Sequence, residues 1–391
     1  MEILLHIFDW ILFVLLGINV LYLAVYSAGA LCRKAVLPEV PVSDYRRILV
    51  LIAAYKEDRV IFDTVNACLS QDYPSDKYDI LVISDHMLPV TNARLRELPI
   101  ELLQVDFEKS TNTKSLKAAL SYVGEGKYDI ALILDADNLV APSYLSDINR
   151  AFAVPGVRAV QTHRVAKNLN TDMAYLDAVS EESNNTIFRL GHVNLGRSAA
   201  LIGSGMAFDY DLFYEIMSKN TSLGGFDRYL ELHLFFRRVK IYYLPHTYVK
   251  DEKIQKTRAF YKQRRRWLAA QYESFREFSR YFGAALRAGK WDFCDKLYQQ
   301  IALPRLLLLG FIVVIALFLS LCASALSYKW WGLFVLLLMA LAVAIPRKYW
   351  TWRLLRALIL VPYTFLLMFI NLFRLKEAKD KFIHTEHGVE E

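Results

Sequence analysis

Long apolar runs at both ends of the chain limit most strongly what it can fold into. They cover residues 4–31, 306–326, 330–345 and 354–373. About 20 consecutive apolar residues cross the hydrocarbon core of a bilayer, so the longer runs reach the length of a transmembrane helix. The sequence therefore predicts an integral membrane protein with N-terminal and C-terminal transmembrane helices on either side of a large middle part.

The first run favours a retained signal anchor over a cleavable signal peptide. No basic region precedes it, and it is longer than the apolar core of a signal peptide. The basic residues Arg33 and Lys34 follow the run, whereas the acidic residues Glu2 and Asp9 precede or enter it. By the positive-inside rule, we expect the middle of the chain on the cytoplasmic side of the cell inner membrane or an equivalent membrane.

The last run, residues 354–373, leaves two arrangements open. Basic residues flank it on both sides, which would place both of its ends in the cytoplasm. Pro362 lies near its middle, where it would kink or break a helix. The run is therefore expected either to cross the membrane as a strongly kinked helix or to form a re-entrant segment.

Charge and cysteine usage exclude several classes of function. The formal net charge is +7, and basic residues lie beside the apolar runs. This distribution favours contact with anionic membrane lipids over binding of nucleic acid. The four cysteines are widely separated, which supports neither a disulfide framework nor a zinc site. The sequence indicates no particular protein partner.

The middle of the chain alternates short β-rich runs with helical patterns. The expected strands cover residues 48–53, 80–84, 102–107, 130–134 and 157–162, and the expected helices cover residues 60–69, 114–123 and 143–152. Such alternation predicts an α/β domain with a mostly parallel sheet between helices. Ligands of these sheets bind at the carboxyl ends of the strands. Two of the expected strands end there on carboxylates, Asp85 and Asp135.

Asp135 and Asp137 form the first candidate site. They stand two residues apart at the end of a buried strand, so their side chains point to the same side if the chain stays extended. Two hard oxygen ligands of this kind suit Mg²⁺ or Mn²⁺, with a nucleotide diphosphate completing the coordination shell. An ordinary turn at the strand end explains the pair equally well without further context.

Asp85 and Lys114 are weaker candidates for binding a nucleotide. A carboxylate at the position of Asp85 can accept an N–H from a nucleobase, although a capping role is also open. Lys114 opens an expected helix, where an anion such as phosphate is favoured. An ordinary solvated lysine is the alternative for that residue.

Later in the chain, a pair of carboxylates follows the two glycines Gly224 and Gly225. Asp227 and Glu231 are four residues apart and share one face of an expected helix. Either could act as the general base that removes a proton from an attacking hydroxyl group. Asp227 could instead cap the helix, and Glu231 could pair with a nearby arginine.

The segment Gln263-Arg264-Arg265-Arg266-Trp267 places an amide, a guanidinium and an indole on one helix face. If the helix is regular, Gln263, Arg266 and Trp267 lie at positions i, i+3 and i+4. A guanidinium suits phosphate, and an indole suits the apolar face of a sugar ring. The three consecutive arginines fan through about 200° of the helix, so we expect Arg264 and Arg265 to face solvent or lipid phosphates.

Taken together, these motifs resemble family 2 membrane glycosyltransferases with the GT-A fold. Ala53-Ala54-Tyr55-Lys56-Glu57 resembles the first-strand motif of that family, and Asp135-Ala136-Asp137 its acidic motif. Gly203-Ser204-Gly205 resembles the loop beside the donor sugar and acceptor. The last segment matches the Gln-x-x-Arg-Trp signature of the branch that contains cellulose, chitin and hyaluronan synthases and the ceramide glucosyltransferases.

The resemblance implies an inverting, metal-dependent glycosyltransferase that uses a nucleotide-sugar donor, a UDP-sugar in preference to a GDP-sugar. It implies Mg²⁺ or Mn²⁺ on Asp135 and Asp137, and a base at Asp227 with Glu231 as the runner-up. The implied nucleotide-sugar contacts are Ala53, Tyr55, Glu57, Asp85, Lys114, Asp135 and Arg266, and the implied contacts to the acceptor or donor sugar are Gly203, Ser204, Gly205, Gln263 and Trp267.

The chain departs from the family pattern at two motifs. Lys56 stands where the first motif commonly has asparagine, and Phe226-Asp227 stands where the family has a Glu-Asp pair. A different alignment would place Tyr229 at the aspartate of that pair and leave Glu231 as the nearby acid. The resemblance therefore supports the assignment of the general base through one matching residue, Asp227.

We expect five regions along the chain. They are an N-terminal anchor at residues 1–34, a cytoplasmic GT-A domain with a mixed, mostly parallel sheet at residues 35–275, interfacial amphipathic helices at 276–305, C-terminal transmembrane segments at 306–376 and a cytoplasmic tail at 377–391. The aromatic and basic residues after Trp267 fit either the membrane interface or packing on the domain.

The number of expected spans bears on the acceptor. A processive synthase must thread its polymer through its own helices, and the chain offers about three or four spans. We therefore expect transfer to a lipid or a membrane-bound glycan, with an extruded β-linked polysaccharide as the alternative. A membrane scaffold that binds a nucleotide sugar without turnover is a remote third possibility.

Overall fold

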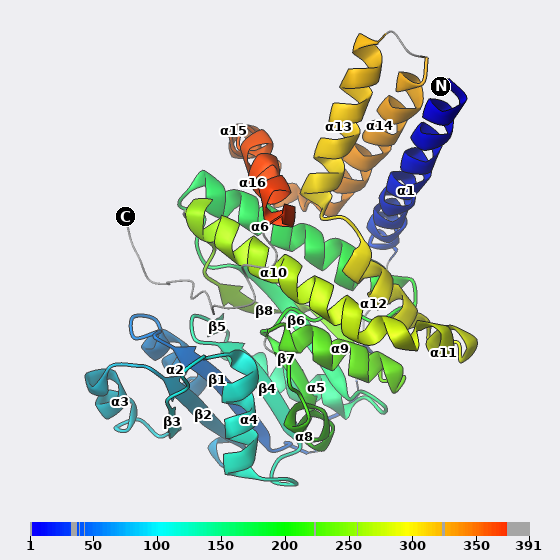
Figure 1. Cartoon of the computed structure of the whole chain (residues 1–391). Coiled ribbons are helices and arrows are strands. Elements are labelled where there is room, and N and C mark those ends of the chain that lie inside the picture. The colour runs from blue at the N-terminus through cyan, green and yellow to red at the C-terminus, as the bar shows by residue number, and fades with distance from the viewer. Residues whose placement is uncertain are drawn as a thin grey trace.

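The computed structural model of the chain describes residues 2–32, 37–38, 40–42, 44–222, 224–255, 257–322 and 325–373. The basic residues Arg33 and Lys34 and the expected tail at 377–391 lie outside these residues. The described part forms a sheet domain, a layer of helices on top of it, and a bundle of apolar helices that projects from that layer (Figure 1).

An eight-stranded mixed sheet forms the centre of the domain. Its strands are β1 (Ile48–Tyr55), β2 (Tyr78–Asp85), β3 (Glu101–Val105), β4 (Ile130–Asp135), β5 (Leu139–Val140), β6 (Ala159–Ala166), β7 (Met206–Asp209) and β8 (Tyr242–Asp251), in the order β3-β2-β1-β4-β7-β6-β8-β5. β1 runs parallel to β2 and β4, and β2 runs parallel to β3. The antiparallel strand β7 separates β4 from β6. The predicted mixed, mostly parallel sheet is confirmed.

Helices cover both faces of the sheet, which explains why its central strands read as unbroken apolar runs. The helices of the domain are α2 (Ile61–Leu69), α3 (Pro89–Leu95), α4 (Asn112–Val123), α5 (Tyr144–Ala153), α8 (Tyr210–Ser218) and α9 (Phe226–Phe236), with a short 3₁₀ turn η1 (Ser75–Lys77). Leu49 and Leu51 of β1 pack in one core with α4, α8 and α9. The alternate residues Ile48, Val50 and Ile52 pack in a second core with α2 and α5.

Three strands, β5, β7 and β8, have no counterpart in the sequence prediction. β5 has two residues and β7 has four, so neither shows a periodic pattern. β8 contains Pro245, and its pairing with β6 shifts register between Thr162 and His163. Proline and irregular pairing both weaken the sequence signal of a strand.

A helical layer lies between the sheet domain and the apolar bundle (Figure 1). It consists of α6 (Asp172–Asn184), the π-helix η2 (Asn185–Gly191), α7 (His192–Asn194), α10 (Thr257–Phe278), η3 (Ser279–Tyr281), α11 (Phe282–Arg287) and α12 (Trp291–Ile301). Phe278, Ala285 and Phe293 of this layer are buried in the same core as α9. Tyr272 and Phe282, in contrast, have exposed side chains.

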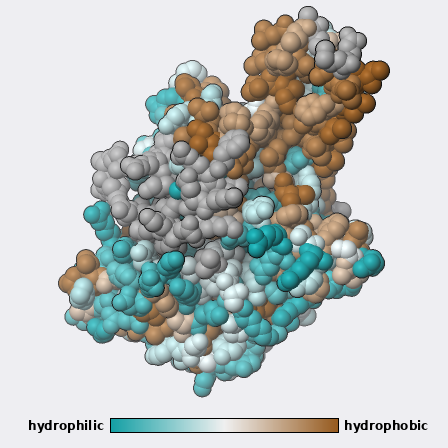
Figure 2. Space-filling view, viewed as in Figure 1, coloured by the Kyte–Doolittle hydropathy of each residue, from teal (hydrophilic) through white to brown (hydrophobic). Residues whose placement is uncertain are grey.

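The apolar runs form helices α1 (Glu2–Gly29), α13 (Arg305–Leu321), α14 (Ser327–Ala344), α15 (Trp352–Leu358) and α16 (Val361–Phe373). The short 3₁₀ turn η4 (Arg347–Tyr349) lies between α14 and α15. In the described residues, Ile3–Gly29 and Ser327–Ala344 are each long and apolar enough to cross a membrane. α12 with α13, and α15 with α16, pass the same test only as pairs that bend by 56° and 44°. Figure 2 shows apolar side chains over the projecting bundle of α1, α13 and α14.

The last apolar run bends, as its proline suggests, but not at the proline itself. The break falls between Leu358 and Val361, and Pro362 is the second residue of α16. Proline is tolerated at this position because the first N–H groups of a helix have no partner within the helix.

One polar contact inside the bundle joins the N-terminal and C-terminal apolar helices. Asp9 of α1 accepts a hydrogen bond of 2.8 Å from Nε1 of Trp330 and pairs with the ammonium of Lys329, both on α14. The Asp9 side chain is buried, and a buried carboxylate is tolerated only when it is paired. This contact therefore holds α1 against α14.

Candidate functional site

A cavity of about 840 Å³ lies where the sheet domain, the helical layer and the apolar bundle meet. Ten of the fifteen residues singled out from the sequence line it: Ala53, Tyr55, Glu57, Asp135, Asp137, Gly203, Asp227, Gln263, Arg266 and Trp267. The other five, Asp85, Lys114, Ser204, Gly205 and Glu231, do not line it. The carboxyl ends of β1 and β4 open into this cavity, as expected for an α/β sheet.

The acidic motif is fixed by hydrogen bonds from its own turn and from the end of β8. Oδ1 of Asp137 accepts from Nδ2 of Asn138 at 3.1 Å, and Oδ2 accepts from the backbone N–H of Glu252 at 2.8 Å. The backbone N–H of Asp135 donates to Oδ1 of Asn138 at 3.0 Å. The pair thus forms a tight turn whose two carboxylates also border the cavity. The turn at the strand end therefore does not remove Asp135 and Asp137 from the cavity wall.

The loop at Gly203-Ser204-Gly205 is pinned to the acidic motif. The hydroxyl of Ser204 donates to Oδ1 of Asn138, and Nε2 of Gln161 donates to the carbonyl of Ser204 at 2.9 Å. Gly205 has φ of +62°, and a Cβ there would lie 2.5 Å from Oγ1 of Thr162. Only glycine fits that backbone. Ser204 and Gly205 therefore hold the loop in place, while Gly203 borders the cavity.

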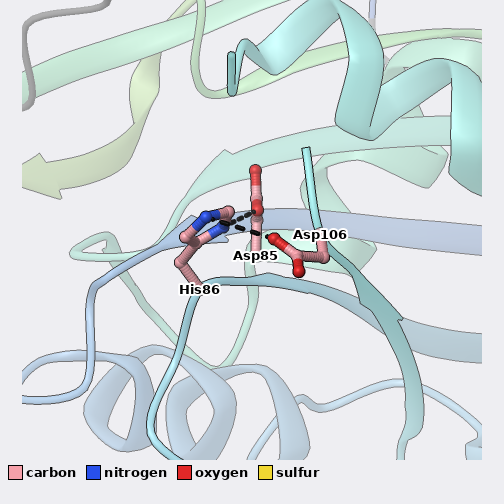
Figure 3. Close-up of side chains that lie close together, drawn as sticks. All are labelled: Asp85, His86 and Asp106. Carbon is pink, nitrogen blue, oxygen red and sulfur yellow. Dashed lines mark hydrogen bonds and ion pairs between the residues drawn. The ribbon is translucent and has the colours of Figure 1, made fainter. Parts of the chain in front are cut away.

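Asp85 ends β2 in a small cluster beside the cavity. Its side chain is 1% exposed, and Oδ1 lies 2.6 Å from Nδ1 of His86. Nε2 of His86 lies 3.2 Å from Oδ1 of Asp106, so the imidazole stands between two carboxylates (Figure 3). The neighbouring Tyr55 lines the cavity, and its ring centroid is 5.6 Å from that of His86. The position of Asp85 at the end of an expected strand is a signal in the sequence, whereas His86 carries no such signal.

Lys114 is turned away from the cavity, and Lys109 borders it instead. Nζ of Lys114 donates to the carbonyl of Lys109 at 2.6 Å, and the backbone N–H of Lys114 donates to Oγ1 of the helix cap Thr111. Lys109, Thr111 and Asn112 line the cavity at the start of α4. The loop before α4 reaches the site, but through a different lysine from the predicted one.

Asp227 and Glu231 occupy different environments on α9. Asp227 borders the cavity in the first turn of the helix, after Gly225, which is the capping residue. Glu231 is 1% exposed, lies 2.5 Å from Nζ of Lys296 and accepts a hydrogen bond from the backbone N–H of Leu201. Burial raises the pKa of Glu231, and the charge of Lys296 opposes that rise. The two acids are therefore not equivalent.

Tyr229, which the alternative alignment would place at the base position, does not border the cavity. Its ring packs against His233 at 4.3 Å and Phe278 at 6.0 Å between centroids, and it belongs to the domain core. The alignment that places Asp227 at that position is the one that puts a carboxylate beside the cavity.

Removing one partner of the buried Glu231–Lys296 pair should destabilise the fold. We expect Lys296→Met to cost about 3–5 kcal/mol, because the buried carboxylate of Glu231 would lose its counter-ion. Thermal unfolding of the purified protein measures this change. The double substitution Glu231→Leu with Lys296→Met should recover most of the loss. Lys127→Met, at an exposed position, is the matched control, and an equal effect of both single substitutions would contradict the assignment.

The helix α10 contributes Gln263, Arg264, Arg266 and Trp267 to the cavity wall. Nη2 of Arg264 donates to Oδ1 of Asp177 on α6 at 2.6 Å, and its guanidinium lies 4.3 Å from the centroid of Trp267. The prediction that Arg264 faces solvent or lipid is therefore wrong. The reason is Asp177, a buried partner that is distant in sequence. Arg265 does not line the cavity, and its guanidinium lies over the ring of Tyr261 at 5.8 Å.

Arg266 is electrostatically linked to the acidic motif. Burial lowers the pKa of Arg266, and the negative charge of Asp135 opposes this effect. The segment of α10 and the end of β4 thus border the same cavity. The sequence order alone did not establish this proximity.

A buried ion network forms the floor between these motifs. Arg164 pairs with Glu181 at 3.0 Å and with Asp251 at 3.4 Å, and Arg189 pairs with Glu181 at 3.3 Å. Burial alone would raise the pKa of Glu181, but Arg164, with Lys253 and Arg189, holds it at about 2. These residues come from β6, α6, η2 and β8 and carry no local sequence motif, so the sequence alone does not identify them.

The far end of the cavity is apolar and belongs to the bundle. Its walls there include Leu306 and Leu309 of α13, Leu341 of α14, Ile345 directly after α14, and Val361 and Met368 of α16. Leu268 of α10 packs against Leu307 and Met368 of the same helices. One continuous space therefore joins the carboxylates at the sheet to side chains of the apolar bundle.

Comparison with curated proteins finds distant relatives. The chain is 24% identical over 242 residues to a beta-monoglucosyldiacylglycerol synthase of Synechocystis sp. (strain ATCC 27184 / PCC 6803 / Kazusa). The aligned region covers 61% of this chain and 50% of the relative. It is 24% identical over 287 residues to the enzyme of the same name from Nostoc sp. (strain PCC 7120 / SAG 25.82 / UTEX 2576), covering 70% of this chain and 59% of the relative. The chain thus spans between half and three fifths of the length of these two relatives.

Among solved structures, a mannosyltransferase from Pyrobaculum calidifontis in complex with GDP-Man and Mn²⁺ superposes with a TM-score of 0.54 at 19% identity. The superposition covers 90% of this chain and 99% of that protein. At this identity the likeness establishes a common fold, which is GT-A. The family described as glycosyltransferase like family 2 matches residues 46–270, more than half of the chain, and the protein belongs to that glycosyltransferase family.

Proposed function

We propose that the protein is a membrane-bound inverting glycosyltransferase that moves a sugar from a nucleotide diphosphate sugar to a hydroxyl of a lipid or a membrane-associated glycan. The observation that carries the proposal is the continuity of the cavity, which runs from Asp135 and Asp137 to the apolar residues of α13, α14 and α16. A hydroxyl on a lipid can enter such a space from the bilayer while a soluble nucleotide sugar enters at the sheet. The relatives named as glucosyldiacylglycerol synthases support a lipid acceptor.

In this proposal a divalent cation is held by Asp135 and Asp137. Their donor set fits the ion, because carboxylate oxygens suit Mg²⁺ and Mn²⁺ and both residues border the cavity. The hydrogen bonds from Asn138 and the backbone of Glu252 orient the carboxylate of Asp137. When bound, such an ion supplies positive charge for the diphosphate of the donor. The Pyrobaculum protein, of the same fold, was solved with a nucleotide sugar and Mn²⁺.

Asp227 is the proposed general base. It borders the cavity and is half-buried, so a hydroxyl can reach its carboxylate. Glu231 is engaged by Lys296 and by the backbone of Leu201, which suits a positioning role for the loop before Gly203. Inversion follows if the hydroxyl attacks the anomeric carbon directly on the face opposite the leaving diphosphate, and an α-linked donor then gives a β-linked product.

Arg266 is proposed to contact the leaving diphosphate, and Trp267 is proposed to contact the sugar ring. The guanidinium of Arg266 lies near Asp135, where it can stabilise negative charge that develops on the leaving diphosphate. Trp267 lines the same wall together with Gln263 and offers a flat face for a sugar ring. Arg264 stacks on Trp267 and bonds Asp177, so it fixes the indole in place. With these proposed roles, the signature from Gln263 to Trp267 supports placing the chain in the Gln-x-x-Arg-Trp branch of the family.

The proposed topology keeps the domain in the cytoplasm, beside the inner membrane or its equivalent. It rests on the basic residues that follow α1 in the sequence and on the two helices apolar and long enough to cross a membrane. Cytoplasmic nucleotide sugars would then reach the sheet side of the cavity directly.

A donor screen tests the proposed function. The purified full chain in lipid vesicles is given UDP- and GDP-sugars, with Mg²⁺ or Mn²⁺, and the released nucleoside diphosphate is measured with and without added diacylglycerol. We expect release from one class of donor, dependent on the cation and stimulated by the lipid. Binding of donors without any release would instead favour the scaffold alternative, and release into a polymer without added lipid would favour a processive synthase.

A further inference from the structure

One oxygen at the end of β2 lacks the donor that its burial requires. Asp85 pairs in register with Tyr55 of β1, so both side chains lie on the same face of the sheet. The carboxylate is 1% exposed, and within the described residues its Oδ2 has no hydrogen-bond partner. Leaving a buried acceptor unsatisfied is costly. This points to a donor group that a bound molecule would supply.

His86 holds the other oxygen of the same carboxylate. Its Nδ1 is 2.6 Å from Oδ1 of Asp85, and its Nε2 is 3.2 Å from Oδ1 of Asp106 (Figure 3). An ionised carboxylate only accepts hydrogen bonds, so the short contact requires the proton on Nδ1. The side chain of Asp106 is 91% exposed, whereas that of Asp85 is buried. The imidazole thus connects the buried acid to one at the surface.

The backbone at this point is bent in a way that only a few residues accept. His86 has φ of +54°, and Lys56, which follows β1, has φ of +57°. The backbone N–H of Lys56 donates to the carbonyl of Asp85 at 3.2 Å, so the two strand ends turn together. Left-handed conformations of residues other than glycine are uncommon and cluster at functional sites. The turn brings the imidazole of His86 back onto Asp85.

We propose that His86 is a positioning residue that fixes Asp85 so that its Oδ2 accepts a ring N–H from the nucleobase of the donor. The inference rests on the proposed function, in which the family resemblance already implies that Asp85 contacts the nucleobase of the donor; the role of His86 is what the structure adds. Uracil and guanine carry a ring N–H at the recognised edge, whereas cytosine and adenine present a bare nitrogen acceptor there. A carboxylate that can only accept would therefore select uracil or guanine and repel the other two.

Asp85, His86 and Asp106 are also residue types that bind cations, and their ligand atoms lie within 4.8 Å of one another. Two ligands of one divalent cation, each at about 2.1 Å, lie about 3 Å apart when they are at right angles. The 2.6 Å between Asp85 and His86 is a charge-assisted hydrogen-bond distance instead. The geometry thus favours hydrogen bonding over a shared ion.

Two substitutions separate the hydrogen bond from the backbone strain. His86→Gly removes the donor and accepts the left-handed φ, whereas His86→Asn keeps an N–H near the position of Nδ1 and also tolerates that φ. His246→Asn, at an exposed histidine, is the matched control. Dissociation constants of the full chain for UDP and CDP, and for GDP and ADP, are measured by calorimetry with Mn²⁺ present throughout.

We expect the unaltered protein to bind UDP more tightly than CDP, or GDP more tightly than ADP. His86→Gly should raise that dissociation constant roughly tenfold and narrow the discrimination, while His86→Asn stays within about twofold. In turnover assays His86→Gly should raise the KM for the donor and leave kcat unchanged. Because binding is read without turnover, the result stands apart from the test of sugar transfer.

Several outcomes would overturn the assignment. Equal binding of UDP and CDP, together with equal binding of GDP and ADP, by the unaltered protein would do so. A dissociation constant that His86→Gly leaves unchanged would show that the imidazole positions nothing. A loss in His86→Asn as large as that in His86→Gly, with binding that requires a second equivalent of cation, would indicate that the trio holds an ion instead.

Discussion

Replacing Asp227 with asparagine should lower kcat on the order of a thousandfold and leave donor binding intact. A general base typically accelerates such a step by about 10²- to 10⁴-fold, and asparagine cannot take the proton of the attacking hydroxyl. The substitution preserves size, and Gly225 rather than Asp227 caps α9, so the helix should persist. Released nucleoside diphosphate measures kcat, and calorimetry measures donor affinity.

Glu231→Gln is the informative comparison for this substitution. It removes a charge that faces Lys296 and the backbone of Leu201, so it should lower thermal stability while the folded fraction still transfers sugar. Undiminished turnover in Asp227→Asn, with loss of turnover by folded Glu231→Gln, would move the base to Glu231.

Replacing Asp137 with alanine should weaken cation-dependent donor binding by roughly a hundredfold or more, because one of two carboxylate ligands is lost. Donor affinity is measured across a titration of Mn²⁺, and the affected quantity is the cation concentration needed for half-maximal binding. Asp76→Asn, at an exposed site distant in the sequence from the acidic motif, is the control.

The surroundings of Asp137 call for a second variant. Asp137 accepts hydrogen bonds from Asn138 and the backbone of Glu252, so alanine also removes contacts that fix the turn. Asp137→Asn keeps the size of the side chain and one acceptor oxygen, and it should still lose cation dependence. An unchanged cation requirement in both variants would remove Asp137 from the metal site.

The central part of the fold could be predicted from sequence because its signals are local. β1, β2 and β4 each contain an apolar run of four or more residues, and β2 and β4 end on the predicted carboxylates Asp85 and Asp135. The strands β7 and β8 could not be predicted in this way. The first has four residues, and the second carries a proline and pairs across a register shift.

The same contrast holds for the site. Motif residues such as Asp137 and Trp267 border the cavity as their spacing suggests. The direction of Arg264 does not follow from helix spacing, because it is set by Asp177, 87 residues away in the chain. Lys109 was missed because nothing in the sequence shows that the ammonium of Lys114 folds back onto its carbonyl. Helix spacing predicts which side chains share one face of a helix. Contacts with other elements determine which of these side chains border the cavity.

The most direct test of transfer to a lipid is to identify the labelled product. The full chain in vesicles is given a labelled nucleotide sugar, with or without diacylglycerol, and products are separated by solvent partition and weighed by mass spectrometry. We expect the label in the organic phase, on a lipid that carries one added sugar, and only when the lipid is present. A polymer that forms without added lipid and stays out of the organic phase would contradict the proposed function.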